Sequence, residues 1–196
     1  SGFSTYSRDV GSNVIYNSSG SQTISSTPQY GNLQLATSGT KTAGGALTVN
    51  GNFQLSGSTA FSGGTSLSHT FKGNWTNNSS FNPSFSYTTS STITLSTPST
   101  PAATSFGGTT PAATAFNNLV ISNTGGVTVN RSVTASGTLT ISSNTTLIPS
   151  DSVTMSGTGG MTVNGTIKVT KNSSNLVGQY TMSGTKTLTG GTVDFS

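Results

Sequence analysis

The 196-residue chain contains no cysteine and no glutamate, and charged residues make up only 5% of it. Without cysteine, neither a disulfide framework nor a thiolate metal site can form. The only acids are Asp9, Asp151 and Asp194, which lie far apart in unlike contexts, so the paired carboxylates of a polysaccharide-cleaving enzyme are not predicted. We therefore expect no enzymatic activity, no cofactor and no metal site.

Basic residues are also few, and they are not clustered. The chain has seven lysines and arginines and a formal net charge of +4, which arises mainly from the shortage of acids. A nucleic-acid footprint requires basic residues gathered on one face, so no nucleic-acid partner is predicted. No apolar run approaches the length of a transmembrane helix, and we expect no membrane span. The single histidine, His69, lacks companion ligands and is interpreted as structural.

Glycine, serine, threonine and asparagine fill most of the sequence, but apolar residues recur at every second position. This alternation is typical of half-buried β-strands and distinguishes the chain from a disordered one. Asn13–Tyr16, Gln22–Ser25 and Thr92–Leu95 are predicted strands. No window shows the 3.6-residue period of an amphipathic helix. The sequence therefore predicts an all-β protein.

Imperfect internal repeats give the strongest architectural signal. Phe116–Ile141 aligns without a gap on Tyr30–Leu55, 86 residues earlier. A shorter phrase, in which a glycine interrupts the apolar alternation, recurs at 47–55, 133–141 and 161–169. Repeats that cannot bury their apolar face alone usually stack on one another. We predict a β-solenoid resembling a parallel β-helix, with two tandem β-sandwich domains as the alternative, because 86 residues also fits an immunoglobulin-like unit.

The repeats divide the chain into three parts. Residues 1–95 are expected to form a first repeat unit with an N-terminal strand or arm, and residues 116–196 a second unit that ends in an uncapped strand. Between them, 96–115 is rich in proline, threonine and alanine. Because proline cannot donate to a β-ladder, this segment is predicted to be a loop or linker.

Several phrases resemble the repeats of large secreted bacterial surface proteins, namely Phe116-Asn-Asn-Leu-Val-Ile121, Ser38-Gly-Thr-Lys-Thr42, Leu47-Thr-Val-Asn-Gly-Asn52 and Lys72-Gly-Asn-Trp-Thr-Asn-Asn78. The resemblance covers most residues from about 13 to 196. It implies an extracellular β-solenoid or stacked-strand rod that serves as a stalk, adhesin or surface fibre. It implies no catalytic residues. Such proteins usually hold many repeats and a separate anchoring domain, whereas this sequence is expected to hold about two long units and no such domain.

Aromatic residues gather in one segment around Trp75. Exposed rings of Trp75, Phe81, Phe85 and Tyr87 would form a platform for surface glycans, which is the signature of a carbohydrate-binding module or adhesin. Large aromatic side chains are more often buried, and we favour a core role for this cluster.

Threonine pairs offer a further alternative. Thr40/Thr42, Thr138/Thr140 and Thr185/Thr187 would form a flat ice-binding face if they lined up on a solenoid, although threonine is also simply a good outward-facing strand residue.

The sequence predicts no covering element of the kind that natural rods place over an open sheet edge at either end. Two explanations fit this expectation: the chain is a piece of a longer rod, or another copy of the chain covers its open ends. Strand addition between copies would pair these ends head to tail and generate a homopolymeric filament. The predicted subunit contacts are Phe3, Tyr6, Thr192, Val193, Asp194, Phe195 and Ser196. The expected function is thus that of a structural subunit or rod segment of a secreted, extracellular bacterial filament or surface fibre.

Overall fold

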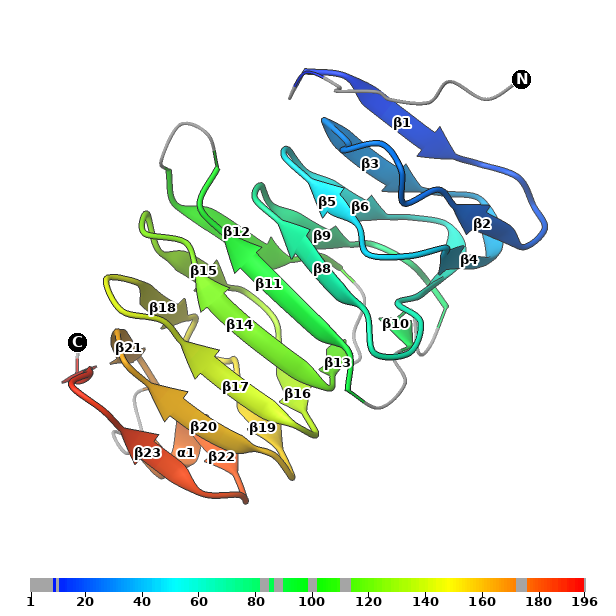
Figure 1. The fold of residues 1–196 in the computed structure, drawn as a ribbon. Coiled ribbons are helices and arrows are strands. Elements are labelled where there is room, and N and C mark those ends of the chain that lie inside the picture. Colours follow the sequence, from blue (N-terminus) through cyan, green and yellow to red (C-terminus); the bar gives the residue numbers. More distant parts are fainter. Residues whose placement is uncertain are drawn as a thin grey trace.

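The computed structural model describes residues 9, 11–81, 85–86, 90–98, 102–109, 114–171 and 176–195. These residues form an all-β solenoid of roughly eight turns, whose successive turns contribute strands to three faces (Figure 1). Every pairing among the described strands is parallel, for example that of β1 (Asn13–Tyr16) with β3 (Asn32–Leu35). The predicted solenoid is confirmed. The sandwich alternative is wrong, since its sheets would be antiparallel.

One face is a nine-stranded sheet that runs the length of the solenoid. Its order is β1, β3, β6 (Phe53–Leu55), β9 (Trp75–Asn77), β12 (Thr104–Gly107), β15 (Val127–Val129), β18 (Thr146–Pro149), β21 (Thr166–Val169) and β24 (Thr192–Phe195).

The second face is a seven-stranded sheet, seen from outside in Figure 1. It consists of β5 (Thr48–Val49), β8 (Ser68–Phe71), β11 (Thr92–Ser96), β14 (Asn118–Ser122), β17 (Thr138–Ile141), β20 (Gly160–Val163) and β23 (Lys186–Leu188).

The third face is split into two four-stranded sheets. The first contains β2 (Gln22–Ile24), β4 (Ser38–Ala43), β7 (Ser58–Ser62) and β10 (Phe85–Ser86). The second contains β13 (Thr114–Phe116), β16 (Val133–Ala135), β19 (Met155–Gly157) and β22 (Tyr180–Met182), and one short helix, α1 (Leu176–Gln179), immediately precedes β22.

The period-2 pattern produces the core directly. In β3, Leu33 and Leu35 are buried, whereas Asn32 and Gln34 between them are half-buried on the outside. Because successive side chains of a strand point to opposite faces, strands of all three faces supply apolar residues to one shared interior. The cluster of buried residues runs from Ile24 near one end to Met182 near the other.

Glycine and asparagine form the corners between the faces. Asn52 donates its backbone N–H to Asn32 Oδ1 of the previous turn (2.7 Å) and accepts the N–H of Asn74 of the next turn on its own Oδ1 (2.9 Å). A Cβ atom at the neighbouring Gly51 would lie 2.4 Å from Asn32 Oδ1. The glycine that interrupts each apolar phrase is therefore required because the corner of the previous turn approaches its Cα too closely for a side chain to fit.

The 86-residue sequence repeat does not correspond to a whole number of turns. Asn32 starts β3 on the nine-stranded face, but Asn118, its counterpart 86 residues later, starts β14 on the seven-stranded face. The two long repeats are thus related by an advance along the solenoid together with a rotation of one face. The repeated sequence unit consists of a strand, a corner and a second strand, and it can form any of the three corners of a turn.

The segment predicted as a loop or linker, 96–115, takes part in the same solenoid. It contributes β12, which pairs with β9 and β15, and the first two residues of β13. The turn that contains it is also the longest: the hydrogen bond from Ser105 N–H to Asn74 Oδ1 spans 31 residues, against 20 and 22 in the two turns before it.

Candidate functional site

The last strand of the nine-stranded sheet is an edge strand among the described residues. β24 pairs with β21, and Thr192 donates its N–H to Gly165 O (2.8 Å). Because successive backbone N–H groups point to opposite sides of a strand, those of Val193 and Phe195 point toward the open edge. The strand expected at 192–196 is thus present over Thr192–Phe195, and it offers main-chain donors and acceptors to a further strand. Ser196 lies outside the described residues.

An apolar hollow of about 180 Å³ lies beside this edge strand. Leu188 of β23 and Phe195 of β24 are 57% and 62% exposed, although they stand at positions that earlier turns bury. The hollow is lined by Met161, Val163, Ile167, Leu176, Lys186, Thr187, Leu188 and Val193. The last described turn therefore leaves part of the apolar core uncovered.

The other end of the nine-stranded sheet is formed by β1. Ile15 of this strand is 51% exposed, and a hollow of about 270 Å³ lies over β1, β3 and β6. Phe3 and Tyr6, the predicted contact residues at this end, lie outside the described residues.

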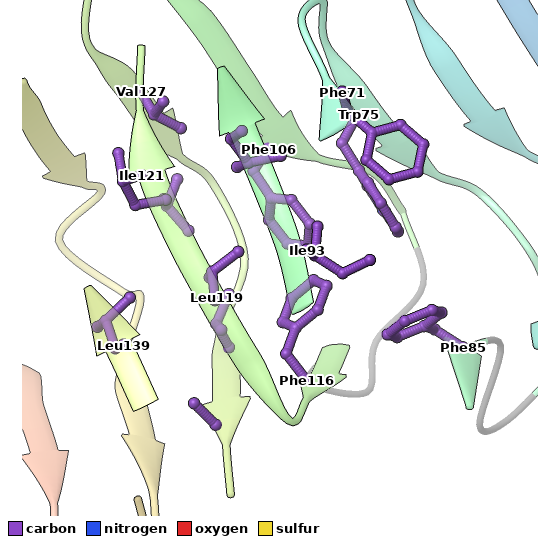
Figure 2. Packing of buried hydrophobic residues seen from close by; sticks show 14 of the residues in the cluster. Phe71, Trp75, Phe85, Ile93, Phe106, Phe116, Leu119, Ile121, Val127 and Leu139 are labelled. Carbon is purple, nitrogen blue, oxygen red and sulfur yellow. The ribbon is translucent and has the colours of Figure 1, made fainter. Parts of the chain in front are cut away.

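The aromatic cluster lies inside the solenoid (Figure 2). Trp75 is fully buried, with ring centroids 4.5 Å from that of Phe53 and 4.7 Å from that of Phe71, and Phe85 is 3% exposed. Burial of both rings removes them from any glycan platform and agrees with the core role that the sequence favoured. Phe81 is 44% exposed and stands apart from this cluster, while Tyr87 lies outside the described residues.

His69 packs at the edge of the same cluster and is fully buried. Its Nδ1 accepts the N–H of Leu47 (3.1 Å), and its Nε2 lies 2.7 Å from Gly63 O, to which it donates. Burial lowers the pKa of His69, and the hydrogen bond to Gly63 partly opposes that shift. Both ring nitrogens are therefore occupied in the neutral form, as expected of a structural histidine.

Lys41 is a buried cation that the sequence argument missed. Its Nζ donates to three backbone carbonyls, those of Ser18 (2.7 Å), Gly20 (2.7 Å) and Ser38 (2.9 Å), and burial lowers its pKa. The ammonium thereby holds the 17–21 turn against the start of β4. The available signal was parity, because Lys41 alternates in phase with Ala43, an inward position.

The three acids lie on separate elements. Asp9 precedes β1, Asp151 follows β18 and Asp194 is on β24, where its Oδ2 lies 3.3 Å from Lys168 Nζ on β21. Within the described part of the chain, no group of three or more histidine, cysteine or acidic residues is placed to hold a metal. The absence of enzymatic activity stays a prediction.

No helix within the described residues is long and apolar enough to span a membrane. A comparison of the chain with known protein families, curated proteins and solved structures finds no match in any of the three.

Proposed function

We propose that this chain is a rod segment of an extracellular filament or surface fibre on a bacterium, joined to copies of itself through its strand edges. The observation that carries the proposal is the nine-stranded parallel sheet, which runs along the whole described solenoid and ends in the unpaired edge of β24. A strand that adds to the edge of such a sheet continues the same parallel pairing. The length of the filament is then set by the number of turns that stack.

Two complementary terms would hold a second copy at this edge. The outward-pointing N–H groups of Val193 and Phe195 would enter a new ladder, which supplies main-chain hydrogen bonds. The exposed side chains of Leu188 and Phe195 and the adjoining hollow would be covered by the first turn of the neighbour, which buries apolar surface. Such a head-to-tail contact does not close on itself and so propagates.

The composition favours association over repulsion. Charged residues make up 5% of the chain, so little like-charge repulsion opposes contact between copies. Together with the resemblance to repeats of secreted bacterial surface proteins, this supports an extracellular structural role.

Electron microscopy of the purified chain, with sedimentation velocity over a concentration series, tests the proposal. The wild-type chain should form filaments one solenoid wide. Val193→Pro should abolish them, because proline removes an N–H that points to the open edge and leaves the Thr192 N–H on β21 in place. Deletion of 192–196 should have the same effect.

Asp194→Asn is the matched control, since its side chain projects from the sheet beside Lys168 and its N–H points away from the open edge. Filaments of Asp194→Asn should look like those of the wild type. Monodisperse wild-type particles at every concentration, or filaments that persist in Val193→Pro, would show that this edge does not join copies.

A further inference from the structure

The outer face of the seven-stranded sheet carries a column of threonines in exact register along the solenoid. The paired positions are Thr48, Thr70, Thr94, Val120, Thr140, Thr162 and Thr187, one from each strand, and Val120 is the only one that is not threonine. A second column, two residues earlier in each strand, includes Thr92 and Thr138. Figure 1 views this face, with the seven strands stacked side by side.

The register converts the sequence motif into a two-dimensional array. Neighbouring strands of a sheet lie about 4.8 Å apart, and alternate residues of one strand lie about 6.7 Å apart. Of the three threonine pairs found in the sequence, Thr138/Thr140 and Thr185/Thr187 both belong to this face, whereas Thr40/Thr42 is on β4 of the split face. Thr92/Thr94 joins the array, although the sequence argument did not single it out.

The hydroxyl groups of the central column are available to a ligand. Within the described residues, none of its six threonines makes a side-chain hydrogen bond, and five of them are half-buried with Thr187 exposed. On the nine-stranded face some outward side chains bind one another instead, as Gln34 does with Ser56 (3.2 Å) and Lys168 with Asp194 (3.3 Å).

The residue types on this face indicate which kind of periodic solid it could bind. A soluble ligand would touch a few turns only, so an array that persists through seven strands matches an extended solid. An ionic mineral would require an array of charged groups, and a crystalline polysaccharide would require exposed aromatic rings. The outward positions within the seven strands hold neither, and two lysines, Lys72 after β8 and Lys186 at the start of β23, lie singly at the margins of the face. The outward positions hold threonine, serine, asparagine, glycine and one valine. A hydroxyl donates one hydrogen bond and accepts two, and so can replace a water molecule in a water lattice.

We propose that the outer face of the seven-stranded sheet binds ice, with the threonine column at its centre. This inference is independent of filament formation, since the face runs along the side of the solenoid and the edge of β24 lies at its end.

Incorporation into a slowly growing ice crystal, with inhibition of ice recrystallisation as a second readout, tests the proposal. The wild-type chain should be enriched in the ice fraction. Thr94→Lys/Thr140→Lys should lose this enrichment and fall to the level of a protein that ice excludes, because two long charged side chains would hold the face away from the lattice. Val120→Thr completes the column and should increase recrystallisation inhibition.

Thr42→Lys/Thr134→Lys is the matched control. It makes the same change in charge on outward positions of the split face, in β4 and β16, and should keep the wild-type enrichment. Circular dichroism and the unfolding midpoint establish that each variant is folded. If the lysine variants fail to fold, Thr94→Val/Thr140→Val removes the hydroxyls at almost constant shape and should reduce enrichment. Exclusion of the wild-type chain from ice, or equal losses in the two lysine variants, would overturn the proposal.

Discussion

The two halves of the solenoid fill the same triangular interior with different side chains. The first half is packed with rings, including Phe53, Phe71, Trp75 and Phe106, and contains the 31-residue turn and the break in the split face between β10 and β13. In the second half, aliphatic residues such as Leu139 and Ile141 dominate, and Asn118 and Thr138 of successive turns are 20 residues apart. Large rings thus surround the longest turn, whereas aliphatic side chains fill most of the second half, including the longer last turn that joins Ile167 to its partner Val193.

Truncation of Trp75, in the half filled with rings, should give the largest loss of stability. Six rings have centroids within 6.4 Å of its own, so Trp75→Ala leaves a cavity that none of them can close. We expect a loss of about 3–5 kcal/mol in the free energy of unfolding, measured by denaturant titration followed by circular dichroism. Ile141→Val in the aliphatic half should cost only about 0.5–1.5 kcal/mol.

The damage should also be local, because a solenoid turn contacts mainly its neighbours. Hydrogen exchange in Trp75→Ala should accelerate at β8, β9 and β11, while β17 and β20 retain their protection. Uniform acceleration over the whole chain would show that the two halves unfold as one unit.

Acid should destabilise the aromatic half through His69, the only histidine of the chain. Burial lowers its pKa in the folded state, whereas an unfolded histidine titrates near pH 6.5. Below about pH 6.5 the unfolded chain therefore binds a proton that the folded chain does not. Stability should be constant above about pH 7 and fall below that value, by at most about 1.4 kcal/mol per pH unit.

Unfolding titrations between about pH 5 and 8 measure this slope, and His69→Gln is the control, since glutamine does not titrate. If His69→Gln keeps the wild-type slope, the buried imidazole is not its source.

The sequence predicted the class of fold because its two signals are local. Alternation of apolar residues defines strands such as Asn13–Tyr16, and the recurrent glycine marks corners such as Gly51. The buried role of Trp75 followed from its size and apolar surface alone.

The features that could not be predicted from the sequence depend on which face of the solenoid a given phrase occupies. The words Ser38-Gly-Thr-Lys-Thr42 and Ser183-Gly-Thr-Lys-Thr187 are identical, yet Lys41 is buried on the split face among three carbonyls and Lys186 is exposed on the seven-stranded face. Turns of unequal length move equal phrases to different faces. The alignment of the threonines therefore became visible only with the register.

The corners should be the place where the two halves behave alike. Asn118 Oδ1 accepts the N–H of Thr138 (2.9 Å) in the aliphatic half, just as Asn52 Oδ1 accepts that of Asn74 (2.9 Å) in the aromatic half. Asn52→Ala should cost about 1 kcal/mol in denaturant titrations, because it removes one such bond at a corner that water can partly reach. Asn118→Ala should cost up to about twice as much, because Asn118 Nδ2 also donates to Ser91 O (3.3 Å) and to Asn117 Oδ1 (2.9 Å). A loss of unfolding free energy at Asn118 several times that at Asn52 would contradict this expectation. It would show that the aliphatic half depends on its corner hydrogen bonds more strongly than the aromatic half does, so that the contributions of corner and core are coupled.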